Sequence, residues 1–187
     1  MIGRWLLSIV LGVLATASIC ALASLPFLFK HYRLVSDGMA PSLTKGAHVF
    51  ALQRPYEQIS AVRRGDVVSW VKHEQGATYI MIWRVVGLPG DKLQFRDTSV
   101  LLNGKELEHV PLPSSGGLLF TERLGNAAYP VAYASSADRR STQALVPPGY
   151  LFVVGDNRDH AFDSRFHGAI PFSSIVGKVV WPPGSLR

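Results

Sequence analysis

The residues with the clearest chemical potential lie just after a long apolar N-terminal run. Two hydroxyl side chains, Ser36 and Ser42, are candidate nucleophiles, and Lys45 follows Ser42 by three positions. A serine attacks a carbonyl only when a general base lies within hydrogen-bond distance of its hydroxyl. Lys45, His31 and the more distant His160 are candidate bases, but Ser42 follows a proline at which the chain has turned away. These residue types suggest nucleophilic hydrolysis, yet they supply no obvious nucleophile and base pair.

Four short segments along the chain are, taken singly, ordinary turn and loop sequences: Ser36-Asp37-Gly38 before Pro41, Arg64-Gly65-Asp66, Gly87-Leu88-Pro89-Gly90-Asp91 and Gly155-Asp156-Asn157-Arg158-Asp159. Glycine accepts positive φ, and Asx side chains bond to nearby backbone, so both favour turns. In the last segment, Arg158 can also pair with a carboxylate.

With their neighbours, these segments form four motifs in a fixed order. They are Met39-Ala40-Pro41-Ser42-Leu43, Arg64-Gly65-Asp66-Val67-Val68, Arg84-Val85-Val86-Gly87-Leu88-Pro89-Gly90-Asp91, and Gly155-Asp156-Asn157-Arg158-Asp159 followed by Asp163-Ser164-Arg165.

The order and spacing of these motifs resemble type I signal peptidases. That family shows an anchor, a Ser-x-Ser-Met-x-Pro segment, an Arg-Gly-Asp strand start, a Lys-Arg strand running into Gly-x-Pro-Gly-Asp, and Gly-Asp-Asn-Arg-Asp with Asp-Ser-Arg. This chain looks similar at every one of these points from Tyr32 to Lys178. The resemblance implies a mainly β, signal-peptidase-like domain with short strands and an inserted loop region, preceded by one N-terminal transmembrane helix.

The same resemblance implies that the reacting unit is missing. The family uses a Ser nucleophile, a neutral Lys base whose pKa is lowered by burial, and a second Ser that orients the Lys. The position of the nucleophile falls on Gly38, that of the base on Trp83, directly before Arg84, and that of the orienting Ser on Ala161. Glycine has no side chain, and an indole N–H only donates hydrogen bonds. We therefore expect no intact catalytic residue.

The supporting residues of the family are retained. The Ser36 hydroxyl and the Gly38 backbone N–H match the groups that stabilise an oxyanion. Aspartate beside the glycine, here Asp37, also occurs in some Gram-positive members. Residues expected to be structural near the site are Met39, Pro41, Arg84, Asp156, Asp163 and Arg165.

Strand alternation predicts what replaces the missing groups. It places Tyr79, Met81, Trp83 and Val85 on one face of a strand. Trp83 should then fill the cavity that the Lys and Ser would occupy, with Ala161 opposite making room. The alternative interpretation is that Trp83 simply packs in the core; either arrangement buries a large ring.

The first functional hypothesis is therefore an inactive homologue that binds exported peptides or surface and pilin-like clients by β-addition. As the resemblance implies, non-cleaving homologues can act in assembly of surface structures. The alternative is an active signal peptidase that cleaves secreted preproteins with a non-standard nucleophile. A third hypothesis is a relic that only folds.

Residues 1–33 are the expected membrane anchor. From Trp5 to Phe29, 25 consecutive residues carry no formal charge, and about 20 helical residues span a hydrocarbon core. A cleavable signal ending near Ala21-Leu22-Ala23 is the alternative, and a lipoprotein role for Cys20 is disfavoured by the bulky Ile19. Flanking charge does not fix the orientation. The resemblance implies a single-pass protein of the cell membrane whose domain faces the extracytoplasmic side.

Composition narrows the partners. The formal charge is +6, but the first 33 residues contain three basic and no acidic residues, so the rest carries 16 basic against 13 acidic residues. These basic residues are scattered, which argues against nucleic acid as a partner. The lipid bilayer and signal peptides or exported, pilin-like proteins are the expected partners. No metal-ligand spacing or nucleotide loop is present, so no cofactor and no metal are expected.

Residues 34–187 read as one β domain. The β-rich runs 67–71 and 79–86 flank Gly76 as a hairpin, and Asn103-Gly104 predicts a two-residue turn. Further strands are expected at 150–154 and 175–181. Residues 110–145, rich in Pro and Gly early on, are expected to form an inserted loop or small subdomain. Within them, Leu118-Leu119-Phe120 reads as a satellite core cluster or, alternatively, a membrane-facing patch.

Overall fold

The computed structural model describes residues 28–136, 139 and 141–182, together with positions 10, 13, 14 and 16. Within this described part, no helix is long and apolar enough to cross a bilayer. Most of the predicted anchor lies outside it. The end of that segment, Phe29–Arg33, forms strand β1 and pairs with the next strand. The β domain therefore begins a few residues earlier than the sequence suggested.

The described fold is mainly β, as predicted. Its short helical elements are η1 (Ile59–Ala61), α2 (Ser164–His167) and η2 (Phe172–Ser174). The remaining strands are β2 (His48–Gln53), β3 (Val67–Glu74), β4 (Ala77–Gly87), β5 (Lys92–Arg96), β6 (Ser99–Leu102), β7 (Lys105–Glu106), β8 (Glu108–Leu112), β9 (Leu118–Leu124), β10 (Ala127–Tyr133), β11 (Thr142–Leu145), β12 (Tyr150–Val154), β13 (Ile170–Pro171) and β14 (Ile175–Trp181).

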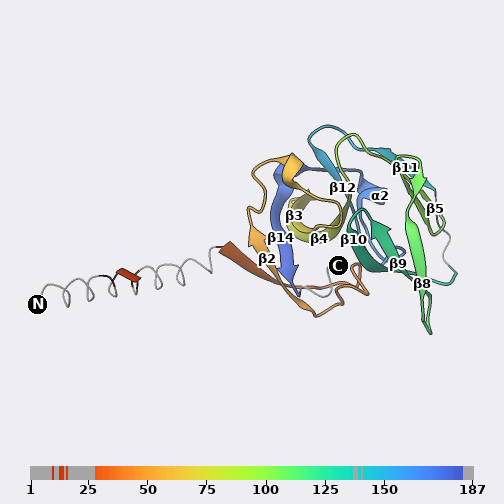
Figure 1. The fold of residues 1–187 in the computed structure, drawn as a ribbon, viewed down its shortest axis with the longest axis horizontal. Coiled ribbons are helices and arrows are strands. Elements are labelled where there is room, and N and C mark those ends of the chain that lie inside the picture. The colour runs from red at the N-terminus through yellow and green to blue at the C-terminus, as the bar shows by residue number, and fades with distance from the viewer. Residues whose placement is uncertain are drawn as a thin grey trace, which may run out of the picture.

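Three sheets make up the domain. A seven-stranded sheet has the order β1-β2-β14-β3-β4-β12-β13, and smaller sheets have the orders β10-β9-β8 and β11-β5-β6-β7. Figure 1 shows the large sheet on the side of the N-terminus and the two small sheets on the opposite side. The last long strand, β14, lies between β2 and β3. The C-terminal part of the chain therefore joins the β1–β2 pair to the rest of the large sheet.

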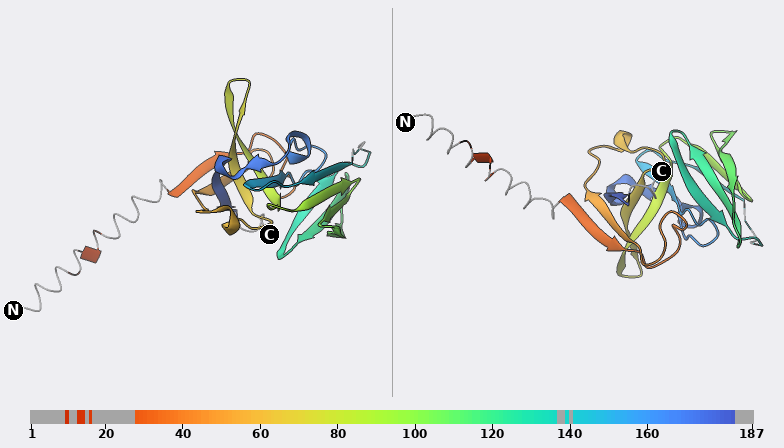
Figure 2. Two further views of the ribbon diagram at one scale, coloured as in Figure 1. Left: turned by 90° about the horizontal axis from the view of Figure 1, so that it is seen from above. Right: turned by 60° about the horizontal axis from the view of Figure 1, so that its bottom comes forward.

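The predicted hairpins are confirmed. β3 and β4 pair from Val67↔Arg84 to Glu74↔Ala77 around Gln75 and Gly76, both of which have positive φ. Asn103 and Gly104 also adopt positive φ between β6 and β7. The outer half of the β3–β4 hairpin projects from the body of the domain, as the yellow-green strands of Figure 2 show.

Residues 110–145 contain regular strands. β8, β9 and β10 form the small three-stranded antiparallel sheet, and β11 pairs with β5. Phe120 packs against the second of two hydrophobic cores, whereas Leu118 is exposed. The Leu118–Phe120 segment is thus partly a core contact and partly surface.

Strand β4 separates the two hydrophobic cores. Trp83 and Val85 lie in a core that includes Met39, whereas Val86 lies in a second core with Phe152. This distribution follows the alternation of side chains along a strand. Because β4 has a core on each side, its residues 83–86 are held firmly in position.

Candidate functional site

Gly38, Trp83 and Ala161, which are distant in sequence, come together in the structure. An ideal Cβ placed on Gly38 would lie 2.5 Å from Cη2 and 2.6 Å from Cζ3 of Trp83, and 3.6 Å from Cα of Ala161. Real Cβ atoms essentially never approach other heavy atoms this closely. The edge of the indole therefore occupies the space that any side chain at position 38 would need.

Gly155 completes this contact. A Cβ on Gly155 would overlap the Cβ of Ala161, would lie 2.5 Å from the carbonyl oxygen of Gly38, and would lie 3.0 Å from Cζ3 of Trp83. Small residues at positions 38, 155 and 161 therefore surround the outer edge of one large ring. Gly155 has no reactive side chain, so its role at this contact was not predicted, although it begins one of the four motifs.

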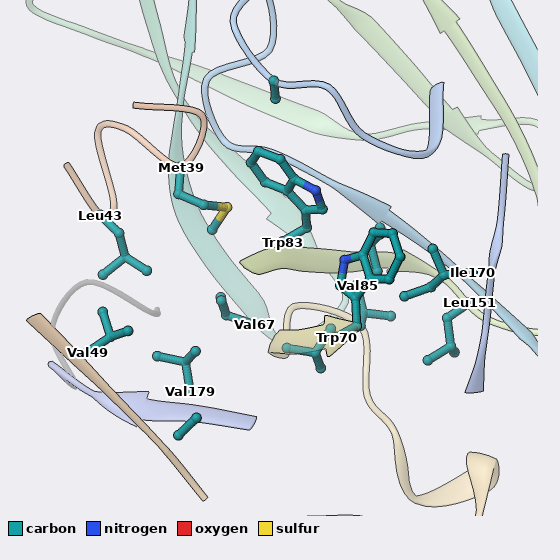
Figure 3. Close-up of a cluster of buried hydrophobic side chains, with 14 of the residues drawn as sticks. Met39, Leu43, Val49, Val67, Trp70, Trp83, Val85, Leu151, Ile170 and Val179 are labelled. Atoms are coloured by element: carbon teal, nitrogen blue, oxygen red, sulfur yellow. The ribbon is translucent and has the colours of Figure 1, made fainter. Parts of the chain in front are cut away.

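Trp83 is buried and belongs to the core that includes Met39 and Trp70. Figure 3 shows its indole extending from β4 toward the segment that carries Met39. Its Nε1–H is buried and has no hydrogen-bond acceptor among the residues that the structure describes. An unsatisfied buried donor costs about 1–3 kcal/mol. Packing must hold the ring in place, because its N–H group makes no hydrogen bond to a described residue that would stabilise this position.

A groove with a volume of about 280 Å³ adjoins Trp83. Its walls are mostly apolar and come from the end of β1 with the segment after it and from the outer part of β4. The lining residues are Tyr32, Arg33, Leu34, Val35, Ser36, Met39, Ile80, Met81, Ile82 and Trp83. Val35 is 84% exposed, so one wall is open to solvent.

Among the residues that the structure describes, no strand pairs with the edge of β4 beside this groove. β12 pairs with β4 only through Arg84, Val85 and Gly87. Residues 77–83 of β4 therefore pair with β3 alone and leave one row of backbone N–H and C=O groups without a strand partner. Such an edge can add another extended chain.

Beneath the site, Arg84 and Asp156 form a buried ion pair. The guanidinium donates to both carboxylate oxygens, at 2.8 and 2.6 Å, and also to the carbonyl of Gly65 at 2.9 Å. It stacks over the ring of Tyr129, with 3.8 Å from Cζ to the ring centroid. Burial alone would lower the pKa of Arg84, but the Asp156 carboxylate outweighs it and raises that pKa. Arg84 and Asp156, each expected to be a structural residue near the site, thus bond to one another.

Asp163 and Arg165 hold the segment that contains Ala161. The Asp163 carboxylate accepts from the backbone N–H of Gly155 at 2.8 Å and from Nη2 of Arg165 at 2.8 Å. It also caps α2 by accepting from the backbone N–H of Arg165. Across the site, the backbone N–H of Asn157 donates to the carbonyl of Gly38 at 3.0 Å. These bonds fix the distance between the Gly38 loop and the Ala161 loop.

The other candidate nucleophile and bases lie apart. The Ser42 hydroxyl is buried near Nη2 of Arg84, at 3.4 Å, while Lys45 is exposed and its backbone N–H donates to Asp37. His31 bonds to His48 on the neighbouring strand rather than to Ser36 or Ser42. Across the described ranges, no lysine ammonium lies within hydrogen-bond distance of a serine hydroxyl.

Comparison with known proteins shows the family of this chain. The family model described as signal peptidase, peptidase S26, matches residues 3–183. The chain belongs to the peptidase S26 family. It is 31% identical to signal peptidase I of Bacillus caldolyticus over 169 residues, covering 88% of this chain and 87% of the relative.

Other members of the peptidase S26 family are also similar. Signal peptidase I of Bacillus licheniformis is 29% identical over 162 residues, covering 87% of this chain and 77% of the relative. A crystal structure of an Enterococcus faecalis signal peptidase I covers 65% of this chain and 98% of that one, with 23% identity and a TM-score of 0.41.

Within this family member, the sequence could locate the centre of the site but not the groove beside it. Gly38, Trp83 and Ala161 were identifiable because each lies next to a recognisable motif. Tyr32, Leu34 and Ile80 line the groove but carry no chemical signal in sequence, since apolar residues at a strand edge look like any other strand residues.

Proposed function

We propose that this peptidase S26 family member binds exported polypeptides in extended form and does not cleave them. The observation that carries the proposal is the contact between the indole of Trp83 and Gly38. At the positions that match the nucleophile and base of the family, this chain has no hydroxyl and no amine. An indole N–H cannot accept a proton, so it cannot replace a lysine base.

The groove supports the binding half of the proposal. The free edge of β4, residues 77–83, offers backbone hydrogen bonds to an added strand, and the apolar walls offer contacts for alternate side chains of that strand. Ser36 and the backbone N–H of Gly38 would lie beside a bound peptide carbonyl as the remnant of an oxyanion site. The relatives are named signal peptidase I, which favours signal peptides as ligands. The proposal adds exported or pilin-like proteins as further clients.

The same proposal includes a membrane location. Of the predicted anchor 1–33, the apolar residues before β1 would enter the bilayer, and the β domain, with its region 110–145, would lie on the extracytoplasmic side. An anchor at the start of β1 would hold the groove, whose wall includes Tyr32, close to the bilayer surface where exported chains emerge.

The test uses the full chain in detergent and a fluorescent preprotein with an intact signal peptide. We expect saturable binding with no change in the mass of the preprotein. Ile80→Asp, which places a charge in the groove, should weaken binding about tenfold or more, equivalent to about 1.4 kcal/mol. Leu145→Asp is the matched control, because Leu145 is an exposed apolar residue on β11 and does not line the groove.

Two outcomes would overturn the proposal. Shortening of the preprotein that is lost in Ser36→Ala or Ser42→Ala would identify an active signal peptidase with a non-standard nucleophile. If the folded wild-type chain does not bind the preprotein, the remaining hypothesis is a relic that folds but has no binding function.

A further inference from the structure

Two exposed histidines, neither of which lines the groove, meet on the surface of β1 and β2. Nε2 of His31 and Nδ1 of His48 are 2.7 Å apart, and the ring planes differ by only 12°. In the strand register His31 lies opposite Phe50 and His48 lies opposite Arg33, so the two imidazoles are diagonal neighbours on one face. The ring of Phe50 packs beside His31 at 5.1 Å and limits its movement on that side.

This pair has the chemistry of a metal chelate. A neutral imidazole has one nitrogen with a free lone pair, and the tautomers Nδ1–H for His31 and Nε2–H for His48 leave both facing nitrogens free. Imidazole nitrogens bind Zn²⁺ at about 2.0–2.1 Å in tetrahedral geometry, so two such ligands are about 3.3–3.4 Å apart. The two nitrogens, observed 2.7 Å apart, would have to separate by about 0.6 Å, which rotation of two exposed side chains can supply.

We propose that His31 and His48 form a surface binding site for a divalent transition metal. Imidazole ligands select Cu²⁺, Ni²⁺ and Zn²⁺ over Mg²⁺ and Ca²⁺, and Cu²⁺ binds tightest in the general order of stability. Among the described residues, no group of three or more His, Cys, Asp and Glu side chains is placed to hold a metal. Water therefore completes the coordination, and the site is exchangeable rather than permanent.

Binding forms two dative bonds, one from each facing nitrogen, and breaks the hydrogen bond between them. In a pair of neutral rings the facing N–H gives its proton to solvent while the outer nitrogen of the same ring takes up a proton, so no net proton is released. The positive charge of the neighbouring Arg33 repels a bound metal cation. No carboxylate lies among the paired residues of β1 and β2 to balance these charges. The metal would link edge strand β1 to β2 at the point where the chain leaves the apolar N-terminal segment.

The test titrates the full, untagged chain in detergent with Cu²⁺ and, separately, with Zn²⁺ at pH 7.5. We expect one saturable site that is weakened at least tenfold in His31→Ala and in His48→Ala, and a copper EPR spectrum with coupling to two nitrogens. Zn²⁺ should raise the Tm of the wild-type chain and of His73→Ala, whose exposed histidine lies on β3, but not of the two site variants.

The double variant His31→Ala/His48→Ala measures background binding by the N-terminus and other histidines. Unchanged metal-free Tm values would show that the site variants are folded. Equal affinity and equal Tm shifts in wild type and double variant would overturn the proposal, whatever the result of the peptide-binding test.

Discussion

The ring edge of Trp83 lies where a side chain on residue 38 would be, with Cη2 only 2.5 Å from an ideal Cβ. The absence of a side chain at position 38 and the presence of an indole at position 83 are therefore one structural feature. A serine at position 38 would therefore clash with the indole, whereas a smaller side chain at position 83 would not clash with Gly38. A side chain at position 38 thus requires a change at position 83, but not the reverse.

The first prediction is that Gly38→Ala destabilises the fold. The backbone of Gly38 lies outside the positive-φ region, so the cost comes from overlap with Trp83 and not from backbone strain. Overpacking of a dense core typically costs about 1–3 kcal/mol. Gly116→Ala is the matched control, because a Cβ there meets nothing within 4 Å. Urea denaturation at equilibrium measures both.

A double-mutant cycle separates this contact from a general loss of stability. Trp83→Leu should be destabilising alone, but Gly38→Ala should cost little in its presence, with a coupling of about 0.5–3 kcal/mol. Additive effects of the two substitutions would show that the ring does not occupy the space beside Gly38.

The turns and the face of β4 that carries Trp83 could be predicted from sequence, because they depend on short motifs and on the alternation of side chains along a strand. Gly76 and Asn103-Gly104 were identified from turn chemistry alone, and alternation placed Trp83 on the correct side of β4. The position of β14 between β2 and β3 was not, since it pairs residues more than 100 apart in sequence. The contact between His31 and His48 depends on the pairing of β1 with β2, which was not predicted because residues 29–33 were assigned to the anchor.

Prolines explain why the strands between residues 110 and 145 were hard to recognise. Pro111 lies in β8 and Pro130 in β10, and both are edge strands of the three-stranded sheet. An edge strand tolerates proline because the missing N–H can face away from the ladder. From sequence alone, the same residues indicate a loop.

The second prediction is that restoring the three residue types that the family uses for cleavage gives an active peptidase. The triple substitution Gly38→Ser/Trp83→Lys/Ala161→Ser should gain cleavage of a preprotein. The lysine removes the indole and makes room for the serine, and burial beside an apolar groove would lower the pKa of its amine. Mass spectrometry of the preprotein after incubation measures the gain.

Gly38→Ser/Trp83→Met/Ala161→Ser is the control for this design, because it relieves the overlap but supplies no base. Equal cleavage by both triple variants would show that the lysine does not act as base. A folded lysine variant that leaves the preprotein intact would mean that the groove no longer aligns a scissile bond.

The third prediction is that the Arg84–Asp156 pair is essential to stability. Both side chains are almost completely buried, so Arg84→Met would leave the Asp156 carboxylate uncompensated. Removal of one partner from a buried pair costs about 3–5 kcal/mol. Arg123→Ala, at the exposed pair with Glu108, should change the free energy of unfolding by less than about 1 kcal/mol. Similar midpoints of thermal unfolding for the two variants would contradict this prediction.

The fourth prediction concerns pH and Glu122, which is fully buried among Arg158, Tyr129 and His109. Burial alone would raise the pKa of Glu122, but the Arg158 charge and the hydrogen bonds to the carboxylate outweigh burial and lower that pKa below its usual 4.5. The unfolded chain therefore binds the proton more readily. The stabilisation is complete well above pH 4.5 and is lost as the pH falls below that value toward the lower folded-state pKa.

Glu122→Gln removes the carboxyl group and with it this dependence of stability on pH. At pH 6 the variant should be about 3–5 kcal/mol less stable than wild type, because Arg158 loses its buried partner. Between about pH 5 and pH 3, the free energy of unfolding of wild type should fall toward that of the variant. Urea denaturation at each pH measures the difference. A difference that stays constant down to pH 3 would show that Glu122 does not carry a lowered pKa in the folded state.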